Sequence, residues 1–250
     1  MVSMKISKHI YLDKTFLFFL IVIVLTGNFN GFLKCFFLLM IHETGHAASG
    51  VILGYKLEKI SFYPYGGITS FSLPINIPLK EELFILIMGP IMQIIGYLFL
   101  RNYVSNLETC HYTLLLFNLL PIYPLDGGRI LNIFINFFFD YLLSIKITFF
   151  ISFFVGIMIF TYYVVNININ VILTLSIIII KLIQYFKKKN YYFYRFLLER
   201  HLYCYSFKKI KDVNNIKKFQ RGYYHFINKE SEKNFLKKYF QENSCINFKI

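Results

Sequence analysis

Acidic residues are scarce in this sequence, tryptophan is absent, and the cysteines show no paired spacing. The 250 residues include 13 Asp and Glu against 27 Lys and Arg. Charged residues make up 16% of the chain and apolar residues 56%, which excludes a disordered chain. The four cysteines are scattered at positions 35, 110, 204 and 245. This scatter argues against a disulfide framework and indicates a reducing environment on the side of the C-terminal residues.

The basic charge and the apolar residues occupy different parts of the chain. Residues 1–186 hold 11 basic and 8 acidic residues, a net charge of +3. Residues 187–250 hold 16 basic and 5 acidic residues, a net charge of +11. We therefore expect a transmembrane domain over 1–186, followed by a small basic cytoplasmic domain over 187–250.

Long uncharged runs predict an α-helical membrane protein with about six transmembrane helices, because a spanning helix needs about 20 apolar residues. The predicted spans cover 15–33, 35–53, 83–100, 109–125 and two halves of 147–180, which Asn166, Asn168 and Asn170 divide. A further apolar stretch, 130–139, follows a break in the fourth span. Lysines gather before the first span and after the last, so the positive-inside rule predicts that both termini are cytoplasmic.

Residues 60–79 are also uncharged, but they cannot form a regular spanning helix. They contain Pro64, Pro74 and Pro78 together with the adjacent pair Gly66 and Gly67. Proline removes a helical hydrogen bond and glycine weakens a helix. We therefore expect an extended or re-entrant loop, with its backbone covered by protein or water.

The second predicted span contains the sequence His42-Glu43-Thr44-Gly45-His46. Positions i and i+4 lie on one face of a helix, so two imidazoles can converge on one metal ion. A catalytic zinc site keeps three protein ligands and one position for water, from which Glu43 could take a proton. The alternative is a pair of buried polar residues bonded to neighbouring helices. We favour the metal site because His and Glu are costly inside a membrane.

A third ligand must come from elsewhere, and the candidates are Asp126, His111, Cys35 and Asp140. Cys35 is about two helical turns before His42, roughly 10 Å along the axis, which is too far to share a metal. We expect His111 to be interfacial and Asp140 to flank the end of a span. Asp126 is favoured because prolines and glycines interrupt the chain around it, although a helix-capping role is compatible with the same pattern.

Two motifs together resemble the site-2 protease family of intramembrane zinc metalloproteases, most closely its stage IV sporulation protein FB branch. They are His42-Glu43-x-x-His46 in an early span, and Asn118-Leu119-Leu120-Pro121 with Pro124-Leu125-Asp126-Gly127-Gly128-Arg129 in a later one. The resemblance covers residues from about 40 to 225. It implies one zinc ion per chain, with His42, His46 and Asp126 as ligands and Glu43 as the general acid/base.

The resemblance also implies positions for substrate contact. Asn118 would position the substrate or stabilise the oxyanion. Gly66 and Gly67 would belong to a membrane-dipping loop whose backbone approaches closely, and Phe71 would gate the substrate groove. Simple packing is the alternative for Phe71.

The implied function is an intramembrane endopeptidase that cleaves a membrane-associated protein, with a sporulation sigma-factor precursor as substrate and membrane-bound inhibitory partners. The implied location is a bacterial cell membrane or the membrane around the forespore. A general membrane protease outside sporulation is the main alternative, and a metal-binding transporter or an inactive scaffold are others. A transporter is typically built from two repeated halves with broken helices, which this sequence does not show.

The basic residues 187–250 are too few for the paired nucleotide-sensing CBS repeat of this branch. Lys211-Asp212-Val213 and Arg221-Gly222-x-x-His225 resemble one degenerate repeat, which leaves ATP binding open. Lys187–Lys189 are expected to contact anionic lipid headgroups of the bilayer. No nucleic-acid-binding module is recognisable, so no nucleic-acid partner is expected.

Overall fold

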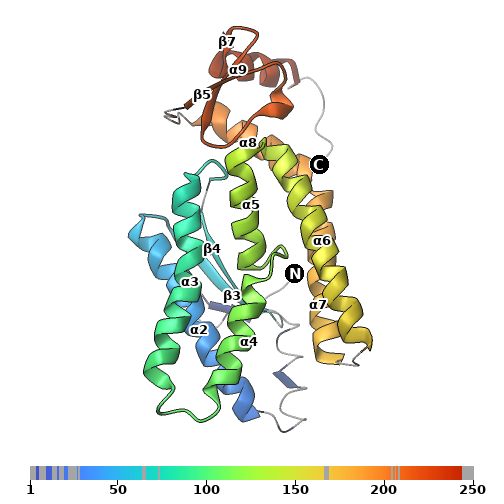
Figure 1. The fold of residues 1–250 in the computed structure, drawn as a ribbon. Coiled ribbons are helices and arrows are strands. Elements are labelled where there is room, and N and C mark those ends of the chain that lie inside the picture. Colours follow the sequence, from blue (N-terminus) through green and yellow to red (C-terminus); the bar gives the residue numbers. More distant parts are fainter. Residues whose placement is uncertain are drawn as a thin grey trace.

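The computed structural model describes residues 29–243 except 64, 65, 73, 166–168, 204, 206 and 208, together with short pieces before residue 29. The described part is mostly helical (Figure 1). The helices of the membrane block are α2 (Phe29–Ile52), α3 (Leu79–Leu100), α4 (Leu107–Leu119), α5 (Asp126–Phe138), α6 (Tyr141–Val165) and α7 (Ile169–Lys187). The predicted turn residues Asn166 and Asn168 lie outside the described residues.

Within the described residues, α2, α3 and α6 are long and apolar enough to cross a membrane. The count of six spans therefore stays a prediction, and most of the first predicted span, 15–33, lies outside the described residues. The boundary predicted at Lys34 is wrong, because α2 continues through it. The Lys34 ammonium donates to the Ser105 carbonyl at 2.6 Å, so this charge is paired at the end of the bundle.

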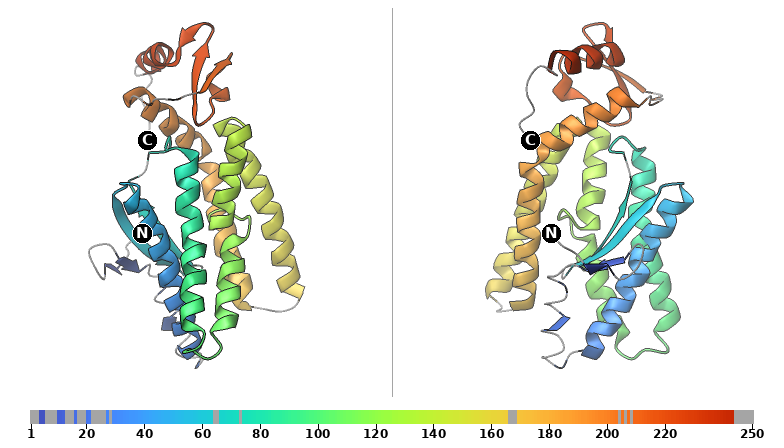
Figure 2. Two further views of the ribbon diagram at one scale, coloured as in Figure 1. Left: turned by 60° about the vertical axis from the view of Figure 1, so that its left-hand side comes forward. Right: turned by 180° about the vertical axis from the view of Figure 1, so that it is seen from behind.

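Residues 60–79 contain most of a β-hairpin made of β3 (Leu57–Tyr63) and β4 (Gly66–Phe71). The hairpin extends a small sheet in the order β1-β2-β3-β4, with β1 at Met4–Lys5 and β2 at Ile10–Leu12. Strands β3 and β4 are antiparallel, and β4 is the edge strand among the described residues. The hairpin lies alongside α2 (Figure 2). The chain is therefore extended over much of 60–79, as predicted, whereas a re-entrant position of this segment in the bilayer stays a prediction.

The fourth predicted span is divided into two helices. Helix α4 ends at Leu119 and α5 begins at Asp126, so the intervening prolines end the first helix as expected. A Cβ on Gly127 would overlap the Leu119 and Leu120 carbonyls. The close packing of this turn therefore requires glycine, and it brings the Asp126 side chain back towards α2.

The C-terminal residues form a compact unit at the end of the bundle opposite to the α3–α4 connection (Figure 1). Its elements are α8 (Lys189–Leu202), β5 (Lys209–Val213), the 3₁₀ helix η1 (Ile216–Lys218), β6 (Tyr223–Ile227), β7 (Glu230–Ser231) and α9 (Glu232–Asn243). Tyr141 and Ile145 of α6 share an apolar core with Phe196, Phe219 and other residues of the unit. This C-terminal unit is therefore packed onto the membrane block.

A cluster of buried polar residues also joins the C-terminal unit to the connection before α3. Arg200 donates from Nη1 to Glu232 at 2.7 Å and from Nε to the Asn76 side-chain oxygen at 2.8 Å. His225 Nδ1 lies 3.0 Å from the other Glu232 oxygen, and Glu199 accepts from the Asn76 backbone N–H at 3.3 Å. We call Asn76, Glu199, Arg200, His225 and Glu232 the docking cluster.

Cys35 and Cys110 form a disulfide between α2 and α4. The scatter of the cysteines did not reveal this pair, because two cysteines separated by 75 residues become neighbours only when the helices pack. The pair lies towards the bundle end away from the C-terminal unit. It does not conflict with a reducing environment around the tail.

Candidate active site

Helices α2 and α5 bring three metal-binding side chains to one point. His42 Nε2 lies 2.9 Å from Asp126 Oδ2, and His46 Nε2 lies 3.1 Å from the same oxygen. The two Nε2 atoms lie 3.1 Å apart. The candidate ligand atoms all lie within 4.8 Å of one another, and His42 and His46 are almost fully buried. We call these three residues the metal cluster.

Hydrogen bonds on the far side of each imidazole fix its orientation. His42 Nδ1 donates to the Gln93 side-chain oxygen at 3.0 Å, and His46 Nδ1 donates to the Ile85 carbonyl at 2.8 Å. With the protons held on Nδ1, both Nε2 lone pairs face each other and the Asp126 carboxylate. Gln93 is itself held, because its amide donates to the His111 carbonyl at 3.0 Å.

These three ligand side chains fit a zinc ion. Two neutral imidazoles and a carboxylate are acceptors with no donor between them, so their mutual approach is unfavourable until a cation joins them. Zinc accepts nitrogen and carboxylate ligands and leaves a fourth position for water in a site with three protein ligands. The chemistry of the three ligand groups and the spacing of the motif thus both indicate a zinc site.

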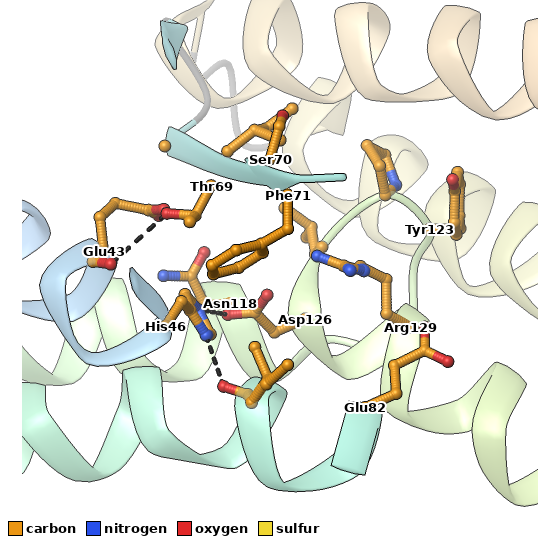
Figure 3. Close-up of a pocket in the computed structure, with 15 residues that line it drawn as sticks. Glu43, His46, Thr69, Ser70, Phe71, Glu82, Asn118, Tyr123, Asp126 and Arg129 are labelled. Atoms are coloured by element: carbon orange, nitrogen blue, oxygen red, sulfur yellow. Dashed lines mark hydrogen bonds and ion pairs between the residues drawn. The ribbon is translucent and has the colours of Figure 1, made fainter. Parts of the chain in front are cut away.

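Glu43 points away from the metal cluster towards β4 but remains in the same cleft (Figure 3). Thr69 Oγ1 donates to Glu43 Oε2 at 2.7 Å, and the Glu43 side chain is buried. A Cβ on Gly67 would overlap the Glu43 carboxyl group. Glycine at 67 therefore lets the edge strand approach this carboxylate.

The cleft has a volume of about 330 Å³ and runs between α2, β4 and the break before α5. Asn118, near the end of α4, lines the cleft next to His46 and Asp126 in Figure 3, and its side chain makes no hydrogen bond within the described part of the chain. Phe71, the last residue of β4, projects into the middle of the cleft. Its ring packs so closely on Gly50 of α2 that a Cβ there would overlap it.

Comparison with known proteins identifies relatives, although no family model matches the chain. The chain is 28% identical over 192 residues to stage IV sporulation protein FB of Bacillus subtilis, covering 71% of this chain and 66% of that protein. It is 33% identical over 184 residues to a zinc metalloprotease of Methanocaldococcus jannaschii, covering 66% of this chain and 53% of that protein. The solved site-2 protease of Methanocaldococcus jannaschii is 28% identical, with a TM-score of 0.59, covering 74% of this chain and 94% of that one.

These homologues support the assignment of the chain to the site-2 protease family. The chain spans slightly under two thirds of the first of these curated relatives and about half of the second. The resemblance identified from the two motifs is therefore confirmed at the level of the family.

The other candidate ligands lie away from the metal cluster. His111 is buried within the bundle and stacks on Tyr97 with ring centroids 4.1 Å apart, while its expected place at the membrane interface stays a prediction. Cys35 is in the disulfide, and Asp140 forms an ion pair with Lys211 at 3.2 Å. Asp140 precedes α6, so the expectation that it flanks a helix end agrees with the structure.

Sequence reasoning missed three residues that shape the site. Gln93 and Thr69 each bond a motif residue from another element, and nothing in their spacing indicates this. Gly89 faces His46 so closely that a Cβ would overlap the imidazole. A buried glutamine and a glycine inside an otherwise apolar span were the available signals for Gln93 and Gly89.

Proposed function

We propose that this chain is an intramembrane zinc metalloendopeptidase that cleaves a membrane-associated protein. His42, His46 and Asp126 would be the metal ligands, and Glu43 the general acid/base. One observation carries this proposal: two imidazole lone pairs and a carboxylate converge at 2.9–3.1 Å in a cleft that also contains a buried Glu43. Three metal-binding groups with a buried carboxylate beside them are the arrangement that metal-assisted hydrolysis needs.

The residues around the metal divide the chemistry among them. A bound zinc ion supplies Lewis acidity and lowers the pKa of a water molecule to about 7. Glu43 takes the proton from the attacking water and returns it to the leaving amine. Thr69 holds one Glu43 oxygen at 2.7 Å, which leaves the other oxygen to face the water. The Asn118 amide has no hydrogen-bond partner among the described residues and lines the cleft, where it can donate to the carbonyl oxygen as negative charge develops.

The edge strand β4 supplies a surface for the substrate backbone. A spanning helix hides its peptide bonds in internal hydrogen bonds, so a substrate must unwind before cleavage. Residues 67–71 of β4 line the cleft, and β4 pairs only with β3 among the described residues. An extended substrate segment could therefore add to β4 as a further strand. Gly66 and Gly67 allow a close approach, and Phe71 would have to move aside or pack against the entering segment.

We further propose a sporulation sigma-factor precursor as the substrate, with membrane-bound inhibitory proteins as partners. The similarity to a stage IV sporulation protein supports this choice. A general role in membrane-protein processing is the second candidate, and it is supported by the similarity to a zinc metalloprotease of Methanocaldococcus jannaschii. Both candidates place the chain in a membrane, with six spans and cytoplasmic termini as the proposed topology.

For residues 187–250 we propose a cytoplasmic domain rather than an independent enzyme. The single small sheet β5-β6-β7 with α9 supports one degenerate CBS-like repeat rather than a pair. Binding of ATP to this single repeat remains a hypothesis. Isothermal titration of ATP into the purified full chain would test it.

The test of the proposed function is co-expression with a sigma-factor precursor that carries an apolar pro-segment. Wild-type chain and Glu108→Gln, an exposed control, should process the precursor, and Glu43→Gln should reduce processing by about 10²–10⁴-fold. Zinc content should be unchanged in Glu43→Gln, since this residue is not a ligand. Processing by Glu43→Gln at the wild-type rate would show that Glu43 is not the base.

A further inference from the structure

A second polar cavity adjoins the active-site cleft on the side of the C-terminal unit. Its volume is about 230 Å³. Glu82, Tyr123 and Arg129 line both the cavity and the cleft, so the two spaces share a wall. Figure 3 shows Arg129 between Tyr123 and Glu82, next to the site. A substrate in the cleft therefore lies within reach of this second cavity.

The charge of the cavity lining is positive. Arg129, Arg195 and Arg221 line it against a single carboxylate, Glu82. Arg221 donates from Nη2 to Glu82 at 2.8 Å and to the Ile77 carbonyl at 3.1 Å. Arg195 is paired with Glu199 at 3.2 Å, so Glu82 is the carboxylate left for Arg129 and Arg221 in this lining. Two guanidinium groups thus face one carboxylate, and the excess positive charge favours an anion.

Two of these arginines have unused hydrogen-bond donors. Arg221 is only 5% exposed, yet its Nε has no hydrogen-bond partner among the described residues. The Arg129 backbone N–H donates to the Leu125 carbonyl, but its guanidinium group makes no hydrogen bond or ion pair within the part of the chain that the structure describes. A buried donor without an acceptor is unfavourable, so an arriving acceptor would be bound strongly. Tyr141 and Tyr185 add hydroxyl groups to the same lining.

The size of the cavity distinguishes between anionic ligands. Pockets for drug-sized molecules usually measure about 300–1,000 Å³, and this cavity is smaller. It can hold a carboxylate side chain or a single inorganic phosphate but not a nucleotide. Because it opens beside the cleft, a side chain of the polypeptide in the cleft is the occupant that the position favours.

We propose that this cavity is a specificity subsite for an Asp or Glu side chain of the substrate. The carboxylate would lie a few residues from the scissile bond, towards the C-terminal unit, and would bind Arg129 and Arg221. The inference rests on the proposed protease function, because it places the substrate in the cleft. It assigns a role to arginines that the hydrolysis itself does not use.

The first experiment measures kcat/KM for a panel of internally quenched peptides with one shared apolar sequence. Each pair carries Asp or Asn at one position near the centre. For wild type, Asp is expected to exceed Asn by about tenfold at one or two positions. This ratio should fall towards one in Arg129→Gln, and it should persist in the exposed control Arg101→Gln. Equal rates for Asp and Asn at every position would overturn the proposal.

A binding experiment separates failure of the subsite from failure of the proposed function. The full-length Glu43→Gln chain in detergent micelles is titrated with the labelled Asp and Asn peptides, and fluorescence anisotropy is followed. The subsite would be supported if the Asp peptide bound more tightly than the Asn peptide and Arg129→Gln abolished this difference. If the difference were present but wild type cut no peptide, the proposed protease function would fail while the subsite stood. Because substitution of Arg221 could loosen the C-terminal unit, Arg221→Lys serves as a second variant that keeps the charge.

Inorganic phosphate identifies the source of the anion. If phosphate weakens binding of the Asp peptide but not of the Asn peptide, phosphate and the Asp carboxylate occupy the same site, which would support the proposal. Arginine-dependent phosphate binding without any preference for Asp peptides would assign the cavity to a free anion, and this would overturn the proposal.

Discussion

The chain contains two buried polar clusters that differ in how their hydrogen bonds are satisfied. In the docking cluster each acceptor meets a donor: Glu232 receives Arg200 on one oxygen and faces His225 with the other. In the metal cluster three acceptors face one another at 2.9–3.1 Å. Satisfied polar groups can serve the architecture alone, whereas convergent acceptors require a cation. The comparison supports a structural role for the docking cluster and the proposed metal-binding role for the metal cluster.

The largest expected effect comes from breaking the docking cluster. Arg200→Met would leave Glu232 and Asn76 without their donor in a buried site, and loss of one partner of a buried ion pair costs about 3–5 kcal/mol. Arg195→Met is the control, because Arg195 is 47% exposed and its pair with Glu199 is worth less than about 1 kcal/mol. Urea unfolding of the full chain in micelles would measure both. Equal losses of unfolding free energy in the two variants would contradict the structural role of the docking cluster.

In the metal cluster the corresponding change is Gln93→Ala. It removes the acceptor that orients His42, and loss of such a supporting hydrogen bond typically lowers metal affinity or activity by about 10–100-fold. Ile94→Ala on the exposed face of α3 is the control. Competition for zinc with a chelating dye gives the affinities. Unchanged affinity in Gln93→Ala would show that the packing of α2 alone orients the imidazole.

The close approach of α2 and α3 is tested by Gly89→Ala. The added Cβ would overlap the His46 ring, and overpacking of this kind costs about 1–3 kcal/mol. Gly31→Ala is the matched control, because a Cβ there meets nothing within 4 Å. The same dye competition and a thermal melt should show a loss in the first variant only. Wild-type zinc affinity and melting temperature in Gly89→Ala would mean that α2 and α3 can move apart enough for the added methyl group without loss of stability.

The smallest effect is a pH dependence of the C-terminal unit. Burial lowers the pKa of His225 below its ordinary value near 6.5, so the folded state resists protonation. Arg200 and Lys211 also lower this pKa, while Glu232 opposes them. The unfolded chain therefore binds more protons below pH 6.5, and stability is full above that pH and falls as the pH drops through it.

Glu232 acts in the same direction at lower pH. Its hydrogen bond with His225 and the charge of Arg200 hold its pKa below the ordinary 4.5, so its contribution is lost as pH falls further. Melting temperatures between pH 7.5 and 5 should decline in wild type and decline less in His225→Gln. If the melting temperatures of the two proteins fell equally with pH, His225 would not be the cause of the pH dependence.

The sequence alone predicts the features that depend on local spacing. His42, Glu43 and His46 follow from the helical period, and the break around Asp126 follows from its prolines and glycines. Gln93 and Thr69 could not be predicted, because each acts through a tertiary contact with a residue more than 25 positions away. The Cys35–Cys110 pair was missed for the same reason, since helix packing alone makes these cysteines neighbours. Lys34 suggests a boundary because it is a charge between two apolar runs. Helix α2 nevertheless continues through it, because the long side chain reaches the Ser105 carbonyl without breaking the helix.

Zinc stoichiometry tests the central claim most directly. Elemental analysis of the purified full chain after equilibration with zinc should give one ion per chain. His46→Ala and Asp126→Ala should reduce this to near zero, whereas Asp140→Ala, outside the metal cluster, should retain it. A wild-type zinc content near zero, or an unchanged content in Asp126→Ala, would contradict the assignment of these convergent acceptors to a metal ion.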